Sequence, residues 1–179
     1  MCIRDSNSPV QLVKDTLRPE NINVFEAWVD VKNSGYTQYD DIAEQFRQIK
    51  NSPVNKYITD YTFFQMLDGR EKGQSVLDLA CGEGHCCRVL KQRGARKVVG
   101  VDISVEMINL ARQQEVQDSL GIDYVCQDAL KLGKIGEFDL VVASFLLNYA
   151  KTKQELVTMC QTAFDNVKPG GYFLSLIHI

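Results

Sequence analysis

Residues 76–85 read Val-Leu-Asp-Leu-Ala-Cys-Gly-Glu-Gly-His, and this stretch decides the fold class of the chain. An apolar run that carries one acid, Asp78, breaks into a turn with two glycines, Gly82 and Gly84, before an apolar helical pattern begins. A buried strand, a glycine turn and a helix make a nucleotide-type pocket at the carboxyl end of the strand. Glycine lets the backbone approach a ligand where a Cβ atom would collide.

Strand-like and helix-like patterns alternate along the rest of the chain. This alternation predicts a Rossmann-like, doubly wound α/β fold, with a mostly parallel sheet covered by helices on both faces. Ser104 is a candidate N-cap, and Thr152 with Glu155 has the capping-box spacing. We expect strands at 75–80, 97–101, 123–126 and 138–144, and helices at 39–50, 54–68, 84–93, 104–116 and 152–166. The inward stripe expected for the last helix is Leu156, Cys160, Ala163, Phe164 and Val167.

Two acids follow the glycine turn at positions where strands end. Asp102 lies 20 positions after Gly82, at the tip of the second strand, where an acid is placed to accept hydrogen bonds from ribose hydroxyls. Asp128 follows the third strand. The third glycine of a dinucleotide fingerprint would fall at position 87, where the chain has Cys87, and this argues against a bound pyrophosphate.

Five segments in register resemble the class I S-adenosylmethionine-dependent methyltransferases. They cover residues 75–173 and read VLDLACGEG, VVGVDIS-x-EMI-x-LAR, CQDAL, FDLVVASFLLNY and KPGG. The upstream stretch around 39–63 is similar to the N-terminal helices of small-molecule members such as the toxoflavin-synthase-like enzymes. The resemblance implies transfer of a methyl group from S-adenosylmethionine to a nitrogen, oxygen or carbon of a small-molecule acceptor by direct displacement.

The resemblance also implies a role for individual residues. Asp102 would hold the ribose, Asp128 the adenine amino group, and Asp78 the amino group of the methionine end. Ile103 and Met107 would sandwich the adenine ring. The implied cofactor-binding set is Asp78, Ala80, Cys81, Gly82, Gly84, Asp102, Ile103, Met107, Asp128, Ala129 and Ser144. Candidate acceptor-pocket residues are Tyr39, Tyr57, Tyr61, Phe145 and Asn148, and no residue is assigned as a general base.

Each role has a structural alternative. Asp102 can be a helix-capping acid, Asp128 a turn former and Met107 a core residue. His85 follows the glycine turn, where packing or solvent exposure is a simpler interpretation than catalysis. Whole-chain alternatives are a nicotinamide-dependent oxidoreductase on a related Rossmann sheet and a non-catalytic S-adenosylmethionine-binding relative. Aminopropyl transfer is disfavoured because Ser144–Tyr149 lacks the acidic residues of a polyamine pocket.

Composition restricts the partners. The chain has 45% hydrophobic residues and a formal net charge of −3, so no basic footprint for nucleic acid is present. No apolar run approaches the roughly 20 residues that span a bilayer. Five cysteines outside the first six residues, an odd number, indicate reduced thiols and a cytoplasmic location. No second Cys/His cluster accompanies Cys86 and Cys87, so we expect no metal site.

The two ends of the chain have an artificial pattern. Met1–Ser6 and Leu174–Ile179 correspond to translations of opposite strands of one DNA element, which resembles the transposon end used in sequencing libraries. Such segments are excluded from fold reasoning. We therefore expect scars at 1–6 and 174–179, a segment of undefined structure at 7–36, and a methyltransferase domain at 37–173 whose C-terminal strands are missing.

Overall fold

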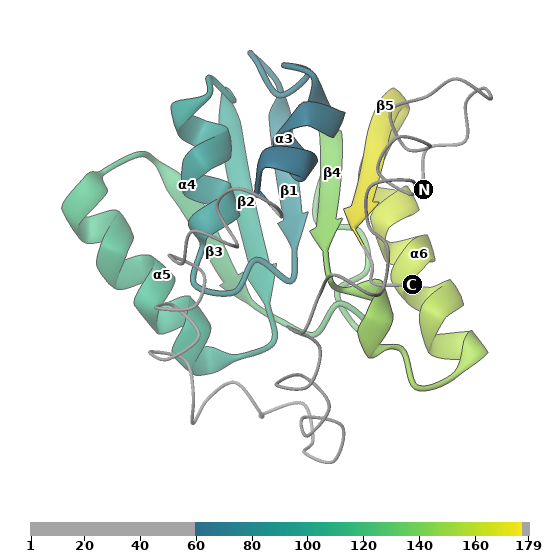
Figure 1. The fold of residues 1–179 in the computed structure, drawn as a ribbon. Helices are drawn as coiled ribbons and strands as arrows, with labels where there is room; N and C mark the ends of the chain where they lie inside the picture. The colour runs from purple at the N-terminus through teal and green to yellow at the C-terminus, as the bar shows by residue number, and fades with distance from the viewer. Residues whose placement is uncertain (1–59, 177–179) are drawn as a thin grey trace, which may run out of the picture.

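The computed structural model describes residues 60–176 (Figure 1). The expected helix at 39–50 and the candidate residues Tyr39 and Tyr57 lie outside this part. Of the expected helix at 54–68, the described part contains α3 (Tyr61–Leu67).

Five parallel strands form one sheet in the order β3-β2-β1-β4-β5. The order reverses at β1, which pairs with β2 on one side and β4 on the other. In open α/β sheets, ligands bind outside the carboxyl ends of the strands at such a switch point. The strands are β1 (Ser75–Leu79), β2 (Lys97–Asp102), β3 (Ile122–Cys126), β4 (Phe138–Ser144) and β5 (Val167–Leu176).

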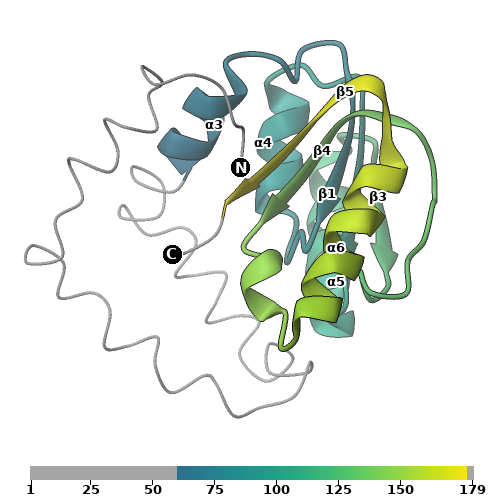
Figure 2. The same cartoon turned by 90° about the vertical axis from the view of Figure 1, so that its right-hand side faces the viewer.

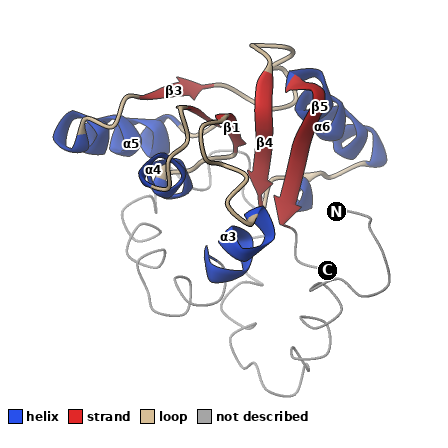
Figure 3. Ribbon diagram, turned by 90° about the horizontal axis from the view of Figure 1, so that it is seen from above, coloured by secondary structure: helices blue, strands red, loops and turns tan. Residues whose placement is uncertain are grey.

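Helices cover both faces of the sheet. In Figures 1, 2 and 3, α3, α4 (His85–Gln92) and α5 (Val105–Asp118) lie on one face and α6 (Lys153–Asn166) on the other. All five residues of β1 are buried, and they alternate between the two cores: Val76 packs with the first, Leu77 and Leu79 with the second. The predicted doubly wound α/β fold is confirmed. None of the described helices has the length and apolarity needed to cross a membrane.

Both predicted helix caps are present. The Ser104 hydroxyl accepts a hydrogen bond from Met107 N at 3.2 Å, and the Thr152 hydroxyl accepts from Glu155 N at 3.1 Å. The return half of the capping box is shifted, because the Glu155 carboxylate accepts from Lys151 N at 2.6 Å. These caps satisfy amides that the first helical turn leaves without partners.

The predicted inward stripe of α6 is wrong in most of its positions. Phe164 is 74% exposed and Leu156 40% exposed, whereas the residues that α6 buries are Met159, Thr162, Ala163 and Asn166. Apolar periodicity failed because two of the inward positions are polar. Thr162 and Asn166 are buried with hydrogen bonds to backbone groups of the loop between β3 and β4.

The KPGG segment at 168–171 lies inside β5 as an irregularity. Phe138 pairs with Val167 and Leu140 with Tyr172, so the four residues between them form a bulge. Residues 174–176, which we expect to be artificial in origin, continue the strand and pair with 142–144. Their apolar character suits a position beside β4, and their origin stays a prediction.

Candidate functional site

The glycine turn after β1 is tied to the end of β2. Gly82 N donates to Asp102 Oδ2 at 2.7 Å, and Cys81 N donates to Val101 O at 3.0 Å. Gly82 and Gly84 have φ values of 56° and 82°, which residues with a side chain rarely adopt. A Cβ atom built on Gly82 would meet no atom of residues 60–176 within 4 Å. Within the described part of the chain, the Gly82 backbone therefore borders open space beside the Asp102 carboxylate.

Asp102 accepts hydrogen bonds from the backbone at two places, and its predicted contact with a ribose stays a prediction. Its Oδ1 atom accepts from Ser104 N at 2.9 Å at the start of α5, while Oδ2 accepts from Gly82 N. Two backbone donors on different elements thus fix the plane of this half-buried carboxylate. A carboxylate oxygen has more than one acceptor site, so it can accept from more than one donor.

Asp78 lies behind the turn. Its side chain is 1% exposed, and Cys87 Sγ donates to its Oδ2 at 3.2 Å. Burial raises the pKa of Cys81 to about 11 and the pKa of Cys87 well above its ordinary value, so both thiols stay neutral. Asp78 therefore exposes very little surface to a ligand. Its predicted contact with a ligand amino group stays a prediction.

Two glycines leave space for side chains that support the turn. A Cβ on Gly100 of β2 would lie 2.8 Å from Cys81 Sγ and 2.9 Å from Cys87 Sγ. A Cβ on Gly84 would collide with the hydroxyl and ring of Tyr124 on β3. Sequence reasoning missed Tyr124 and Gly100. Glycine inside a buried strand was the available signal, because it marks close approach by another group.

Of the predicted adenine-binding residues, Ile103 directly follows β2, Met107 lies in the first turn of α5, and Asp128 follows β3. Ile103 is 37% exposed, whereas Met107 is 2% exposed and offers little surface to a ring. Asp128 also acts as a turn former: its Oδ1 accepts from Leu130 N at 2.9 Å, and its Oδ2 lies 3.9 Å from Lys131 Nζ. The carbonyl of the buried Ala129 accepts from the Thr162 hydroxyl at 2.9 Å.

Backbone strain marks the two central strand ends. Four described residues other than glycine have positive φ, and two of these, Asp68 and Ser119, are ordinary helix C-caps. The other two are Ala80, directly after β1, and Phe145, directly after β4, with φ values of 63° and 65°. Because β1 and β4 pair, both residues lie at one edge of the sheet. Such strain clusters at functional sites.

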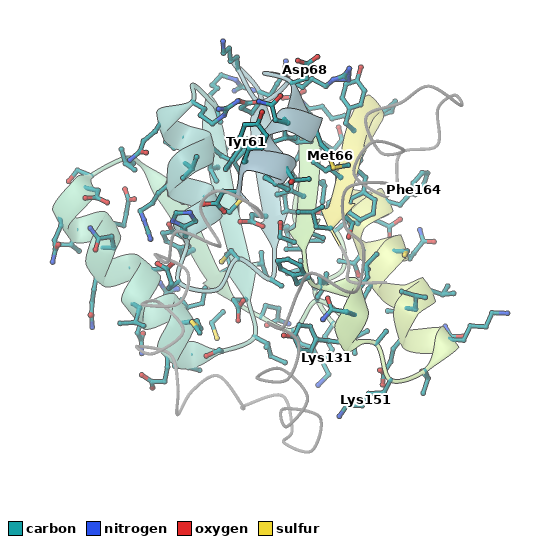
Figure 4. The ribbon with its side chains drawn as sticks, viewed as in Figure 1. Tyr61, Met66, Asp68, Lys131, Lys151 and Phe164 are labelled. Carbon is teal, nitrogen blue, oxygen red and sulfur yellow. The ribbon has the colours of Figure 1, made fainter. Side chains whose placement is uncertain are left out.

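The remaining candidates with described positions come from the end of β4, the residues that follow it, and α3. Ser144 ends β4, Phe145 is half-buried, and Asn148 is exposed on the short 3-10 helix η4 (Leu147–Tyr149). Lys131 and Lys151 lie on the loops below the strand ends, at the carboxyl edge of the sheet, and Tyr61 lies on α3 (Figure 4). Tyr61 is 62% exposed.

His85, the first residue of α4, contacts the segment that precedes α3. Its Nε2 atom lies 2.7 Å from Asp60 Oδ2, and both side chains are about one quarter exposed, at 26% and 23%. Among residues 60–176 no group of three His, Cys, Asp or Glu side chains is arranged to hold a metal ion.

A cavity of about 280 Å³ lies at the opposite edge of the sheet. Asp139 at the start of β4, Arg70 and the bulge at Lys168–Tyr172 line it. It is remote from the strand ends that carry the predicted site, and Lys168 and Ser75 already satisfy the Asp139 carboxylate.

Known proteins are similar to this chain in sequence and in fold. Residues 76–171 match the family model described as a methyltransferase domain. The chain is 39% identical over 110 residues to the putative methyltransferase YqeM of Bacillus subtilis, and 37% identical over 109 residues to a ubiquinone biosynthesis O-methyltransferase of Coxiella burnetii. Each alignment covers 60% of this chain and 43% or 45% of the relative, so the chain spans less than half the length of these proteins.

Solved structures have the same architecture. An S-adenosylmethionine-dependent methyltransferase from Mesorhizobium loti superposes with a TM-score of 0.57 at 29% identity, over 69% of this chain and 52% of that one. The N-methyltransferase NodS from Bradyrhizobium japonicum, solved with S-adenosyl-L-homocysteine, gives 0.68 at 17% identity, over 78% and 71%. The family match favours the methyltransferase hypothesis over the nicotinamide-dependent one. The chain belongs to the methyltransferase domain family.

Proposed function

We propose that this chain binds S-adenosylmethionine at the carboxyl edge of β1 and β2 and transfers its methyl group to a small-molecule acceptor. The observation that carries the proposal is the 2.7 Å hydrogen bond between Gly82 N and Asp102 Oδ2. It brings a glycine turn that borders open space next to an acid at the tip of the neighbouring strand. The similar structure from Mesorhizobium loti, an S-adenosylmethionine-dependent methyltransferase, supports the same donor.

The described residues suit this cofactor chemically. Asp102 offers fixed carboxylate oxygens to ribose hydroxyls, and charged acceptors make strong hydrogen bonds. Gly82 and Gly84 offer backbone to the methionine end without a Cβ in the way. Ile103 offers exposed apolar surface to the adenine, and Asp128 an acceptor for its amino group. The proposed wall of the site also includes Ala80, Cys81, Ala129 and Ser144. The buried side chains of Met107 and Asp78 support this wall from behind.

S-adenosylmethionine supplies a methyl carbon that its sulfonium already activates for direct displacement. The protein therefore has to orient the acceptor and keep water out. The apolar run Phe145–Leu147 after β4 suits both tasks for a small, weakly polar acceptor. Asn148 and Tyr61, with Tyr39 and Tyr57, are the polar and aromatic groups proposed to select it.

A methyltransfer assay with radiolabelled S-adenosylmethionine tests the proposal. Phenols, primary amines and activated-methylene compounds form the small-molecule panel. Ribosomal protein forms the macromolecular arm, because a 38% identical relative from Burkholderia multivorans is named a ribosomal protein L11 methyltransferase. Label in a small molecule supports the proposal. Label in protein alone overturns its acceptor class, and cofactor binding without turnover on any acceptor indicates a non-catalytic relative.

A further inference from the structure

The glycine turn has a second anchor on the side away from β2. Arg88, one turn into α4, reaches back to Glu83 in the turn. Its Nη2 lies 2.5 Å from Glu83 Oε2, and its Nη1 donates to Glu83 O at 2.6 Å. One guanidinium therefore holds both the carboxylate and the carbonyl of the same turn residue.

This anchor is buried. The side chains of Arg88 and Glu83 are 15% and 5% exposed, so solvent screens their interaction poorly. Burial opposes the charge on Arg88, but the interactions with Glu83 and Tyr124 together outweigh it and raise the pKa of Arg88. Arg88 therefore stays charged.

Tyr124 closes the same corner. Its side chain is 7% exposed, and its ring fills the space that a side chain at position 84 would need. Burial raises the pKa of Tyr124, so its hydroxyl stays neutral. The turn is thus enclosed by Asp102 from β2, Arg88 from α4 and Tyr124 from β3.

We propose that Arg88 is a positioning residue that preorganises the glycine turn for the amino-acid end of S-adenosylmethionine. The inference rests on the proposed function and adds to it that Asp102 and Arg88 hold different residues of the turn. A turn with two glycines at positive φ has many accessible conformations, and fixing them before binding reduces the entropy cost of binding. Asp102 fixes Gly82, whereas Arg88 fixes Glu83, one residue closer to the helix.

Two ligands distinguish the part of the site for the adenosine end from the part for the amino-acid end. S-adenosylhomocysteine carries both the adenosine and the amino-acid ends, whereas 5′-methylthioadenosine lacks the amino-acid end. Arg88→Met in the full chain should weaken binding of S-adenosylhomocysteine by about tenfold or more, equivalent to about 1.4 kcal/mol. Binding of 5′-methylthioadenosine should change less than about twofold, and calorimetry measures both.

Arg88→Met leaves the buried Glu83 carboxylate without its partner, which can prevent folding. The double variant Glu83→Gln with Arg88→Met removes both charges and avoids this cost. It should fold, and it should keep the selective loss of S-adenosylhomocysteine affinity. Arg88→Lys should restore affinity in part, since lysine keeps the charge but not the two-pronged geometry.

The chain contains a matched control. Arg93, at the other end of α4, lies 2.6 Å from Glu71, which is fully buried. Glu71→Gln with Arg93→Met removes an equivalent pair at the opposite edge of the sheet. It should alter the free energy of unfolding and leave both affinities unchanged.

Three results overturn the inference. The first is a folded Arg88 double variant that binds S-adenosylhomocysteine like wild type. The second is an equal loss of affinity for both ligands, which indicates a general structural role. In both cases the wild-type chain still binds S-adenosylhomocysteine, so the proposed function is not contradicted. The third is a wild-type chain that binds neither ligand, which removes the proposed function and this inference together.

Discussion

The backbone N–H of Gly82 donates a 2.7 Å hydrogen bond to the carboxylate of Asp102, 20 residues further along the chain. The contact joins the turn after β1 to the tip of β2, at the place where the strand order reverses. It makes the turn and the acid one structural unit, so changing either should alter the other.

Asp102→Asn should lower the affinity for S-adenosylhomocysteine by about 100-fold, because hydrogen bonds to charged groups contribute about 1.5–3 kcal/mol each. The amide keeps the size of the side chain but places a donor group among donors. Calorimetric titration measures the effect. Asp123→Asn, the same change at an exposed position of β3, is the control. Unchanged affinity in Asp102→Asn would remove Asp102 from the proposed ribose site.

Ala80→Gly should leave stability unchanged or raise it by up to about 1 kcal/mol. Glycine relieves the left-handed backbone at this position, which costs other residues about 1–2 kcal/mol, and part of the gain is offset by the greater freedom of the unfolded chain. Urea unfolding measures the difference. Ala143→Gly, in the buried interior of β4, should instead destabilise by about 1 kcal/mol. Equal losses in both variants would contradict the strain at Ala80.

Strain at Ala80 was not predictable from periodicity, although the surrounding elements were. The strands at 75–80 and 138–144 carry continuous apolar runs bounded by turns, and the N-caps at Ser104 and Thr152 are local signals. These features depend on residues close together in sequence. The support of the turn by Tyr124 and Arg88, with the space that Gly100 leaves, depends on three elements. A glycine inside a buried strand indicates close approach at Gly100, but no local pattern identifies the groups that approach it.

Asn166 illustrates the other failure of pattern reasoning. It is fully buried in α6, where its Oδ1 accepts from Ile135 N at 2.8 Å and its Nδ2 donates to Gly133 O at 2.8 Å. Apolar periodicity placed the exposed Phe164 inward and had no reason to place an amide there. A buried asparagine serves here because the loop backbone needs partners that a helix cannot otherwise supply.

Asn166→Ala should therefore destabilise the protein by about 3 kcal/mol, because it leaves several buried backbone groups without partners. Phe164→Ser should cost no more than about 0.5 kcal/mol, since the ring is largely exposed. Chemical denaturation of the two variants side by side measures the contrast. A larger loss for Phe164→Ser would mean that the orientation of α6 described above is wrong.

Asp139 should contribute stability that depends on pH. Hydrogen bonds from Lys168 Nζ at 2.7 Å and from the Ser75 hydroxyl and N–H hold its pKa below the ordinary value. Because the folded-state pKa is depressed, the contribution is full above about pH 4, the unfolded-state value, and is lost as pH falls further. Asp139→Asn should thus destabilise by about 1–2 kcal/mol at pH 7.

The difference between wild type and Asp139→Asn should narrow as the pH falls from 4 toward the depressed folded-state pKa, as measured by urea unfolding across this range. Glu137→Gln, two residues earlier, should show a smaller change, because the exposed pair of Glu137 with Lys134 is screened by solvent. A constant difference between wild type and Asp139→Asn down to pH 2 would contradict the assigned hydrogen bonds.

Calorimetric titration of the full wild-type chain with S-adenosylhomocysteine, and separately with NAD, tests the central claim most directly. A site built from the Gly82 turn and Asp102 for adenosylmethionine predicts saturable binding of S-adenosylhomocysteine with one site per chain and no binding of NAD. Binding of NAD without S-adenosylhomocysteine, or of neither compound by a folded chain, would contradict it.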